Sequence, residues 1–240
     1  INLEVIMSEA LANYEEAERI RMEINLKHLE NGVVFTDLKA AYIGAQVVIG
    51  KGTRIGPCVT LEGNTTIGEN CILGQNTKIV NSQIGDETDI QSSVILDSKV
   101  GMAVHVGPFA YIRPNCKIGD GVKVGDFVEV KNSTMGKGSK ASHLTYIGDS
   151  DVGQNVNLGC GVVFVNYDGK NKHRSTVGDG AFIGCNSNLV SPVHIEDGAY
   201  VAAGTTVTRN VPKGALCVGR AKDRNVEGWV EKRGLLKKSK

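Results

Sequence analysis

The stretch IGKGTRIGPCVTLEGNTTIGENCILGQNTKI, residues 49–79, repeats itself every six residues. An aliphatic side chain returns at each step, and glycine usually follows it, as in Ile49–Gly50 and Ile55–Gly56. An α-helix repeats every 3.6 residues and a β-strand every two, so neither accounts for this period. A sustained six-residue period is typical of a parallel β-helix, in which each hexad forms one side of a triangular coil.

The period extends over most of the chain. The interior position recurs at residues 43, 49, 55, 61, 67, 73, 79, 84, 90, 95, 100, 106, 112, 118, 124, 130, 135, 141, 147, 152, 158, 164, 177, 183, 189, 195, 201 and 207. Three hexads close one coil, and coils stack at the strand spacing of ~4.8 Å. We therefore expect an all-β parallel β-helix over residues 39–211, with glycine permitting its tight corners.

The two ends and one internal segment depart from the period. Residues 8–30 predict an amphipathic helix with Leu11, Tyr14, Ala17, Ile20 and Ile24 on one side; it would cap the repeats or link them to another domain. We assign residues 1–38 to this helix and linker, and residues 212–240 to an irregular basic tail. The step from 164 to 177 is thirteen residues, so VNYDGKNKHRST, residues 165–176, predicts a loop projecting from the prism.

Composition narrows the function classes. The formal net charge is +1, which argues against a nucleic-acid-binding or membrane-binding surface. No apolar run approaches the ~20 residues of a membrane span. The six cysteines form no CxxC pair, so we expect a reducing, cytoplasmic setting. Because the chain opens at Ile1 rather than methionine, we expect it to be part of a longer protein.

Counting coils predicts which residues stack on one another. Arg113 and Lys131 each follow an interior position, one coil apart, so they should lie about 5 Å apart along the backbone. Two like charges at this distance repel by roughly 1 kcal/mol in water and by more near a protein surface. A bound phosphate would reverse that cost, although two long side chains splayed into solvent is the competing interpretation.

A second column contains a histidine. His143, Cys160, Cys185 and Ala203 each lie two places after an interior position, on successive coils. Small side chains would let an extended ligand lie along the backbone, and a histidine at the end of the column could exchange protons near neutral pH. A metal site is the main rival, but the other histidines do not converge with His143, so we expect no metal.

Several segments resemble a known family. GPFAYIRP, VGDFVEVKNSTMGKGSKASHLTYIGD, VNLGCG, VNYDGKNKH and VAAGTTVTRNVP are similar to the C-terminal half of the bacterial bifunctional N-acetylglucosamine-1-phosphate uridyltransferase/glucosamine-1-phosphate acetyltransferases. The resemblance implies a left-handed β-helix, a homotrimer with active sites between subunits, and no uridyltransferase activity in this chain. It implies acetyl transfer from acetyl-CoA to the 2-amino group of glucosamine 1-phosphate, on the way to UDP-N-acetylglucosamine and the cell envelope.

The resemblance also implies roles for individual residues. His143 would be the general base, and the sugar phosphate would be held by Arg113, Lys131, Tyr146, Asn157 and Lys172. Acetyl-CoA would lie along Cys160, Asn166, Tyr167, Cys185, Ala203 and Arg220. Cys160 and Cys185 stand where the family usually has alanine or serine, and their predicted separation is within the Cα range of a disulfide.

Two other functions stay open at this point. Another hexapeptide acyltransferase would keep the fold and the histidine but would not need the Arg113/Lys131 pair. A non-catalytic β-helix acting as an assembly platform would need neither. Sequence alone does not identify the donor that would stabilise an oxyanion.

Overall fold

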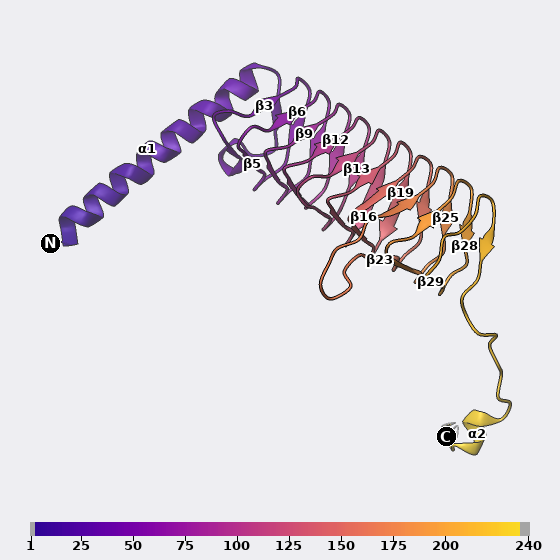
Figure 1. Cartoon of the computed structure of the whole chain (residues 1–240). Helices are drawn as coiled ribbons and strands as arrows, with labels where there is room; N and C mark the ends of the chain where they lie inside the picture. Colours follow the sequence, from indigo (N-terminus) through magenta and orange to yellow (C-terminus); the bar gives the residue numbers. More distant parts are fainter. Residues whose placement is uncertain (1–2, 236–240) are drawn as a thin grey trace.

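The computed structural model describes residues 3–235 as a prism of stacked coils with a long helix at one end (Figure 1). As far as β28, each strand pairs in parallel with the strand three places before it in the chain, where there is one, so three strands make one coil. The result is a left-handed parallel β-helix with three flat faces, as expected. We call the faces A, B and C in the order in which the chain visits them.

The three faces contain every strand of the described residues. Face A consists of β1 (Val34–Phe35), β4 (Arg54–Ile55), β7 (Ile72–Leu73), β10 (Asp89–Ile90), β13 (His105–Val106), β16 (Lys123–Asp126), β19 (Lys140–His143), β22 (Asn157–Leu158), β25 (Phe182–Ile183), β28 (Tyr200–Val201) and β30 (Leu216–Cys217). Face B consists of β2 (Tyr42–Ile43), β5 (Thr60–Glu62), β8 (Lys78–Val80), β11 (Val94–Leu96), β14 (Tyr111–Ile112), β17 (Glu129–Lys131), β20 (Tyr146–Gly148), β23 (Val163–Val165), β26 (Asn188–Val190) and β29 (Thr206–Val207). Face C consists of β3 (Val48–Ile49), β6 (Thr66–Ile67), β9 (Gln83–Ile84), β12 (Lys99–Val100), β15 (Lys117–Ile118), β18 (Thr134–Met135), β21 (Ser150–Val152), β24 (Ser175–Val177) and β27 (His194–Ile195).

The interior positions expected from the six-residue period are all buried. Each lies in a strand, and none is more than 7% exposed. They form one continuous apolar column, mainly of isoleucine, valine and leucine, that also contains Met135, Ala141 and the aromatic Phe164. Burial of this column is what favours the coiled state.

The ladder runs further than the hexad count indicated. β1 pairs with β4, and β30 pairs with β28, so the paired strands extend from Val34 to Cys217. Val211 is also buried and bridges Ile195 on face C. The period was not visible here because the interior residues are spaced irregularly along the sequence.

Glycine has a different role from the one expected at many corners. A Cβ on Gly50 would lie 2.6 Å from the backbone of Gly68 on the next coil, although Gly50 does not have a positive φ. The glycine after the interior residue therefore provides room for the next coil rather than a left-handed turn. Left-handed turn positions are instead often filled by asparagine, such as Asn76 and Asn155.

The N-terminal helix α1 (Leu3–Glu30) caps the prism only through its last turns. Asn25 is buried and donates from Nδ2 to the carbonyls of Leu38 (2.8 Å) and Ala41 (3.0 Å), beside the short 3-10 helix η1 (Leu38–Ala40). Of the apolar side expected for this helix, Ile24 packs against the core, whereas Leu11, Tyr14 and Ile20 are exposed. The remaining helix projects away from the prism (Figure 1).

Two features complete the chain. The expected loop leaves the prism after Val165 and returns at Ser175, and it projects clear of the coils near β23 (Figure 1). The tail after Cys217 contains a single short helix, α2 (Trp229–Lys232), within the described residues. None of the helices described over residues 3–235 is both long and apolar enough to cross a membrane.

Candidate active site

Arg113 and Lys131 occupy the same position on neighbouring coils, at the corner where face B ends. β14 and β17 pair Ile112 with Val130, which places the two cations in register. The expected repulsion is relieved within the protein, because each cation has its own carboxylate. Arg113 Nη1 lies 2.8 Å from Glu129 Oε1, and Lys131 Nζ lies 3.0 Å from Asp149 Oδ2.

Asp149 is the centre of a buried polar network. Its carboxylate accepts hydrogen bonds from Lys131 Nζ, from Asn132 Nδ2 at 2.6 Å and from Asn166 Nδ2. Burial acts to raise the pKa of Asp149, but these hydrogen bonds outweigh it and lower that pKa. Burial also acts to lower the pKa of Lys131, but the hydrogen bond and the negative charge of Asp149 oppose burial, and the pKa of Lys131 is raised. Asp149 therefore stays ionised and holds Lys131 in place.

The projecting loop brings a third cation to this corner. Lys172 lies close enough to Lys131 and Arg113 that their positive charges lower its pKa, with Lys131 the larger cause. Arg113, Lys131 and Lys172 form what we call the cation cluster. Tyr146 lies beside it, with its hydroxyl 3.4 Å from Asn166 Nδ2. The cluster has more positive than negative charge and can bind an anion such as a phosphate.

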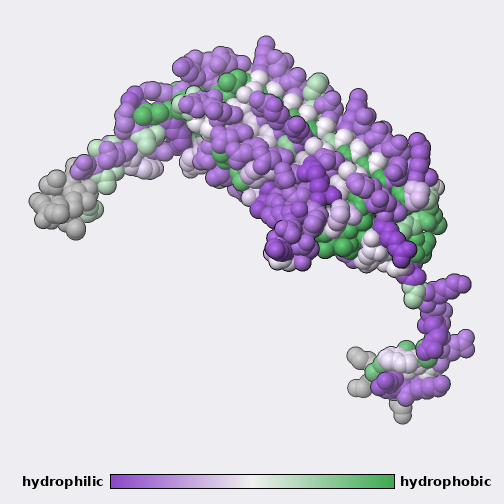
Figure 2. Space-filling model, in the orientation of Figure 1, coloured by the Kyte–Doolittle hydropathy of each residue, from purple (hydrophilic) through white to green (hydrophobic). Residues whose placement is uncertain are grey.

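Both ends of the loop are fixed to the prism. Asn166 is buried and bound to Asp149, while Arg174 makes a two-pronged ion pair with Asp151, with Nε and Nη2 each 2.6 Å from a carboxylate oxygen. The tip is closed by Asp168, whose carboxylate accepts from the backbone N–H groups of Lys170 and Asn171. Figure 2 shows a hydrophilic surface over this loop, beside a hydrophobic patch toward the C-terminal end of the prism.

His143 lies at a different corner, where face A turns into face B. Its Nδ1 is 2.5 Å from Asp126 Oδ1, and the two residues are register neighbours on β19 and β16. The hydrogen bond to His143 lowers the pKa of Asp126. With Nδ1 donating to this carboxylate, Nε2 carries the lone pair and can accept a proton. The side chain of His143 is 57% exposed, so a substrate can reach it.

The column predicted above His143 is present. The pairing of β19 with β22, β22 with β25, and β25 with β28 places His143, Cys160, Cys185 and Ala203 in register on successive coils. Cys160 and Cys185 are free thiols. Arg220, from the tail, donates from Nη1 to the carbonyl of Ala203 at 2.5 Å. The column offers a backbone-lined strip with a cation at its far end.

Asn157 lies apart from the cation cluster in the single chain, whereas Tyr167 stays beside Lys172 through an antiparallel bridge within the loop. Asn157 projects from face A, in register with Lys140 and Phe182, and is therefore on a different face from Arg113 and Lys131. Tyr167 is exposed, and its hydroxyl donates to the carbonyl of Gly169 within its own loop.

The sequence reasoning did not identify the carboxylates of the site. Asp126 could have been found by extending the histidine column one coil toward the N-terminus, because it too lies two places after an interior position. Asp149 occupies the corner position two places after Ile147, beside Lys131. The partner of Arg174, Asp151, had no comparable signal, since it depends on how the loop returns to the prism.

Comparison with known proteins supports the repeat assignment and the resemblance. The family model described as bacterial transferase hexapeptide (six repeats) matches residues 46–81, 97–132 and 174–209. The bifunctional protein GlmU of Clostridium beijerinckii is 57% identical over 223 residues, which cover 93% of this chain and 49% of that protein. The bifunctional protein GlmU of Clostridioides difficile is 54% identical over 216 residues, covering 90% and 47%. The chain thus spans about half the length of these curated relatives.

A solved structure shows the same fold at low sequence identity. LpxA from Bacteroides fragilis, a UDP-N-acetylglucosamine acyltransferase, superposes with a TM-score of 0.50 at 17% identity, covering 74% of this chain and 69% of that one. This likeness concerns the fold alone. The repeats and the curated relatives together show similarity to bacterial hexapeptide transferases and to about half of the bifunctional GlmU proteins, consistent with their C-terminal, acetyltransferase half.

Proposed function

We propose that the chain transfers the acetyl group of acetyl-CoA to the 2-amino group of glucosamine 1-phosphate. The main support is the cation cluster, in which Arg113 and Lys131 from the prism meet Lys172 from the loop. Acyl transfer to an unphosphorylated acceptor would not need this arrangement. The similarity to GlmU proteins supports the same acceptor.

The cation cluster would bind the phosphate of the acceptor. Glu129 and Asp149 already neutralise Arg113 and Lys131 in part, so Lys172 would supply the remaining charge. Charge-assisted hydrogen bonds to phosphate are strong and directional, and they would fix the sugar relative to the prism. Tyr146 would line the same site. Holding the sugar in this way converts binding energy into proximity of the amine to the thioester.

His143 would be the general base. Because Nδ1 donates to Asp126, Nε2 would take a proton from the attacking amine as its nitrogen forms a bond to the thioester carbonyl carbon. The tetrahedral intermediate would collapse with cleavage of the carbon–sulfur bond. The proton on Nε2 would then pass to the departing thiolate of CoA, which leaves the amide product and a neutral histidine.

Acetyl-CoA would lie along the column above His143. Cys160, Cys185 and Ala203 would expose backbone to the extended arm of the cofactor, and Arg220 would face its phosphates. Asn166 and Tyr167 would lie at the junction between cofactor and acceptor. The side chains along the column are small, which supports this placement.

We further propose that the active protein is a homotrimer with its sites between subunits. Asn157 lies on face A, apart from the cation cluster on face B of the same chain. A neighbouring copy with face A turned toward this corner would complete the site. Sedimentation analysis of the protein tests the assembly directly.

An acetyl-CoA consumption assay with two acceptors tests the proposed function. Glucosamine 1-phosphate should be acetylated, whereas unphosphorylated glucosamine should react far more slowly at equal concentration. Replacing Arg113 by alanine should reduce this preference, because the phosphate would lose part of its binding site. Equal rates with both acceptors would show that the cation cluster does not select the substrate.

A further inference from the structure

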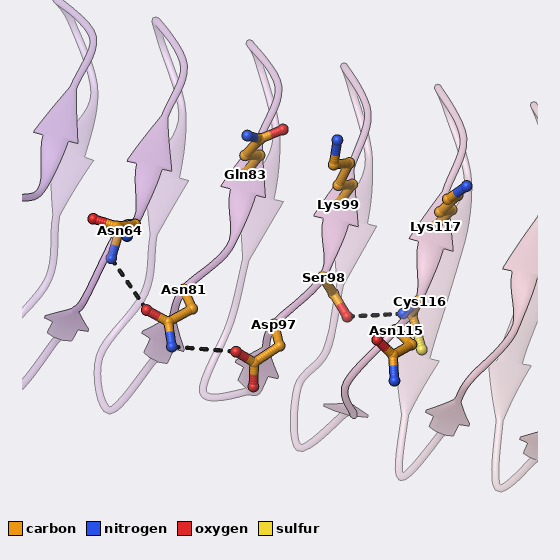
Figure 3. Close-up of a pocket in the computed structure, with 9 residues that line it drawn as sticks. All are labelled: Asn64, Asn81, Gln83, Asp97, Ser98, Lys99, Asn115, Cys116 and Lys117. Atoms are coloured by element: carbon orange, nitrogen blue, oxygen red, sulfur yellow. Dashed lines mark hydrogen bonds between the residues drawn. The ribbon is translucent and has the colours of Figure 1, made fainter.

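A second groove lies on the prism, beside the cation cluster at the corner between faces B and C and away from the histidine column; Ser98, which lines it, donates to the carbonyl of Arg113. Lys99 on β12 and Lys117 on β15 are register neighbours on face C, with Gln83 on β9 next to them. These side chains line one wall of a groove of about 610 Å³. Figure 3 shows the three pointing the same way from successive strands, above a second row of polar residues at the corner between faces B and C.

The two lysines differ from the cations of the candidate active site in making no ion pair within the part of the chain that the structure describes. Arg113 and Lys131 each have a carboxylate partner, whereas within residues 3–235 neither Lys99 nor Lys117 makes an ion pair. Two ammonium groups held at the spacing of neighbouring strands repel one another. An anion bound between them would remove this repulsion and gain charge-assisted hydrogen bonds from both.

The second row consists of groups suited to hydroxyls. The backbone N–H of Asn64 donates to Asn81 Oδ1 at 3.1 Å, and Asn81 Nδ2 donates to Asp97 Oδ1 at 3.2 Å. This chain of bonds orients the row, and Asn115 continues it on the next coil (Figure 3). A side-chain amide both donates and accepts, and a carboxylate accepts, so the row matches hydroxyl groups better than a second anion.

We propose that this groove binds a small polyhydroxylated anion of the sugar-phosphate class. Lys99 and Lys117 would contact the phosphate, while Gln83 and Asn115 would contact the hydroxyls. Asp97 would disfavour the reverse orientation by repelling the phosphate. The groove does not depend on the proposed acetyl transfer, since it shares no residue with the cation cluster or the histidine column.

Binding is measured by calorimetric titration of the full chain without acetyl-CoA, using inorganic phosphate, glucose 6-phosphate and glucose as probes. Lys99→Gln/Lys117→Gln should weaken glucose 6-phosphate binding by about tenfold or more. The matched control is Lys123→Gln/Lys140→Gln, which removes the same charge from another in-register lysine pair, on face A. The control should change the affinity by less than about twofold, because it leaves the groove intact.

Two further variants distinguish binding in the groove from binding at the cation cluster. Gln83→Met should weaken glucose 6-phosphate binding and leave phosphate binding unchanged, because it removes only an amide. Lys131→Ala should weaken any binding at the cation cluster by about tenfold or more and leave binding in the groove in place. Equal losses in both lysine pairs, no binding of glucose 6-phosphate, or complete loss of its binding in Lys131→Ala would each overturn the proposal.

Discussion

Replacing Asp149 by asparagine tests whether this carboxylate organises the candidate active site. The change preserves the shape of the side chain but removes its charge and turns an acceptor into a donor that faces Lys131 Nζ and Asn166 Nδ2. The side chain of Asp149 is 9% exposed and that of Lys131 is 17% exposed, so the lysine would lose its partner in a place that water reaches poorly.

The cost can be estimated from the lost contacts. Breaking a fully buried ion pair by removing one partner costs about 3–5 kcal/mol. Because both side chains retain some exposure, solvent screening reduces this figure. We expect a loss of about 3 kcal/mol in unfolding free energy at pH 7, which corresponds to a fall in Tm of about 6–12 °C for a chain of this size.

The same loss should depend on pH. The pKa of Asp149 is lowered in the folded protein, so its contribution to stability is complete above the ordinary carboxyl pKa of about 4 and is lost as the pH falls through the folded-state value. The stability difference between wild type and Asp149→Asn should therefore be constant near neutral pH and shrink in acid. Thermal unfolding followed by circular dichroism at pH 7 and at about pH 3 measures both differences.

The control is Asp89→Asn, which removes a carboxylate from another stacked pair. Asp89 Oδ2 lies 3.0 Å from His105 Nδ1, but both side chains are more than one-third exposed, so the change should cost less than about 1 kcal/mol. An equal effect of the two substitutions at pH 7, or a difference for Asp149→Asn that persists unchanged in acid, would refute the central position given to Asp149.

Four further predictions concern the proposed chemistry. His143→Ala should lower kcat by about 10²–10⁴-fold with little change in substrate binding, and near-normal turnover would exclude it as the base. Lys131→Ala should raise KM for glucosamine 1-phosphate by about tenfold or more, and an equal rise for acetyl-CoA would contradict a phosphate site. Alkylation of Cys160 and Cys185 should block activity, with protection by acetyl-CoA; harmless modification would place the thiols outside the cofactor path. Arg174→Lys should keep the charge but lose the two-pronged pair with Asp151, making the loop easier to cleave in limited proteolysis, and unchanged cleavage would exclude it as an anchor.

The six-residue period predicted most of the prism because it specifies both which residues are interior and which lie above one another. Each interior position from Ile43 to Val207 is buried, and Arg113 stacks with Lys131 as the coil count requires. The same count predicted the histidine column. These relations depend only on the number of residues in a coil, which the sequence displays directly.

The six-residue period did not predict contacts made by the projecting loop or by side chains that reach diagonally across coils. The thirteen-residue step indicated that a loop leaves the prism, but the place where Lys172 comes to lie depends on the anchors at Asn166 and Arg174. Likewise, the partner of Arg113 is Glu129, which lies diagonally on the next coil rather than directly above. Such pairs are determined by the length of the side chains and the geometry of the corner. The six-residue period of the sequence gives no information on either.

This difference changes the physical account of the cation cluster. Stacking alone would give two uncompensated charges that need a ligand, whereas the structure pairs Arg113 with Glu129 and Lys131 with Asp149. Repulsion between Arg113 and Lys131 therefore does not destabilise the folded prism in the absence of a bound anion. The loop cation Lys172 supplies the net positive charge of the cation cluster. The neighbouring Lys131 lowers the pKa of Lys172, and a phosphate bound here would raise it again. By linkage, the affinity for the phosphate must then depend on whether Lys172 is protonated. Affinity for the phosphorylated acceptor should accordingly decline as pH rises through the pKa of Lys172, and should depend on the loop more than on the stacked pair.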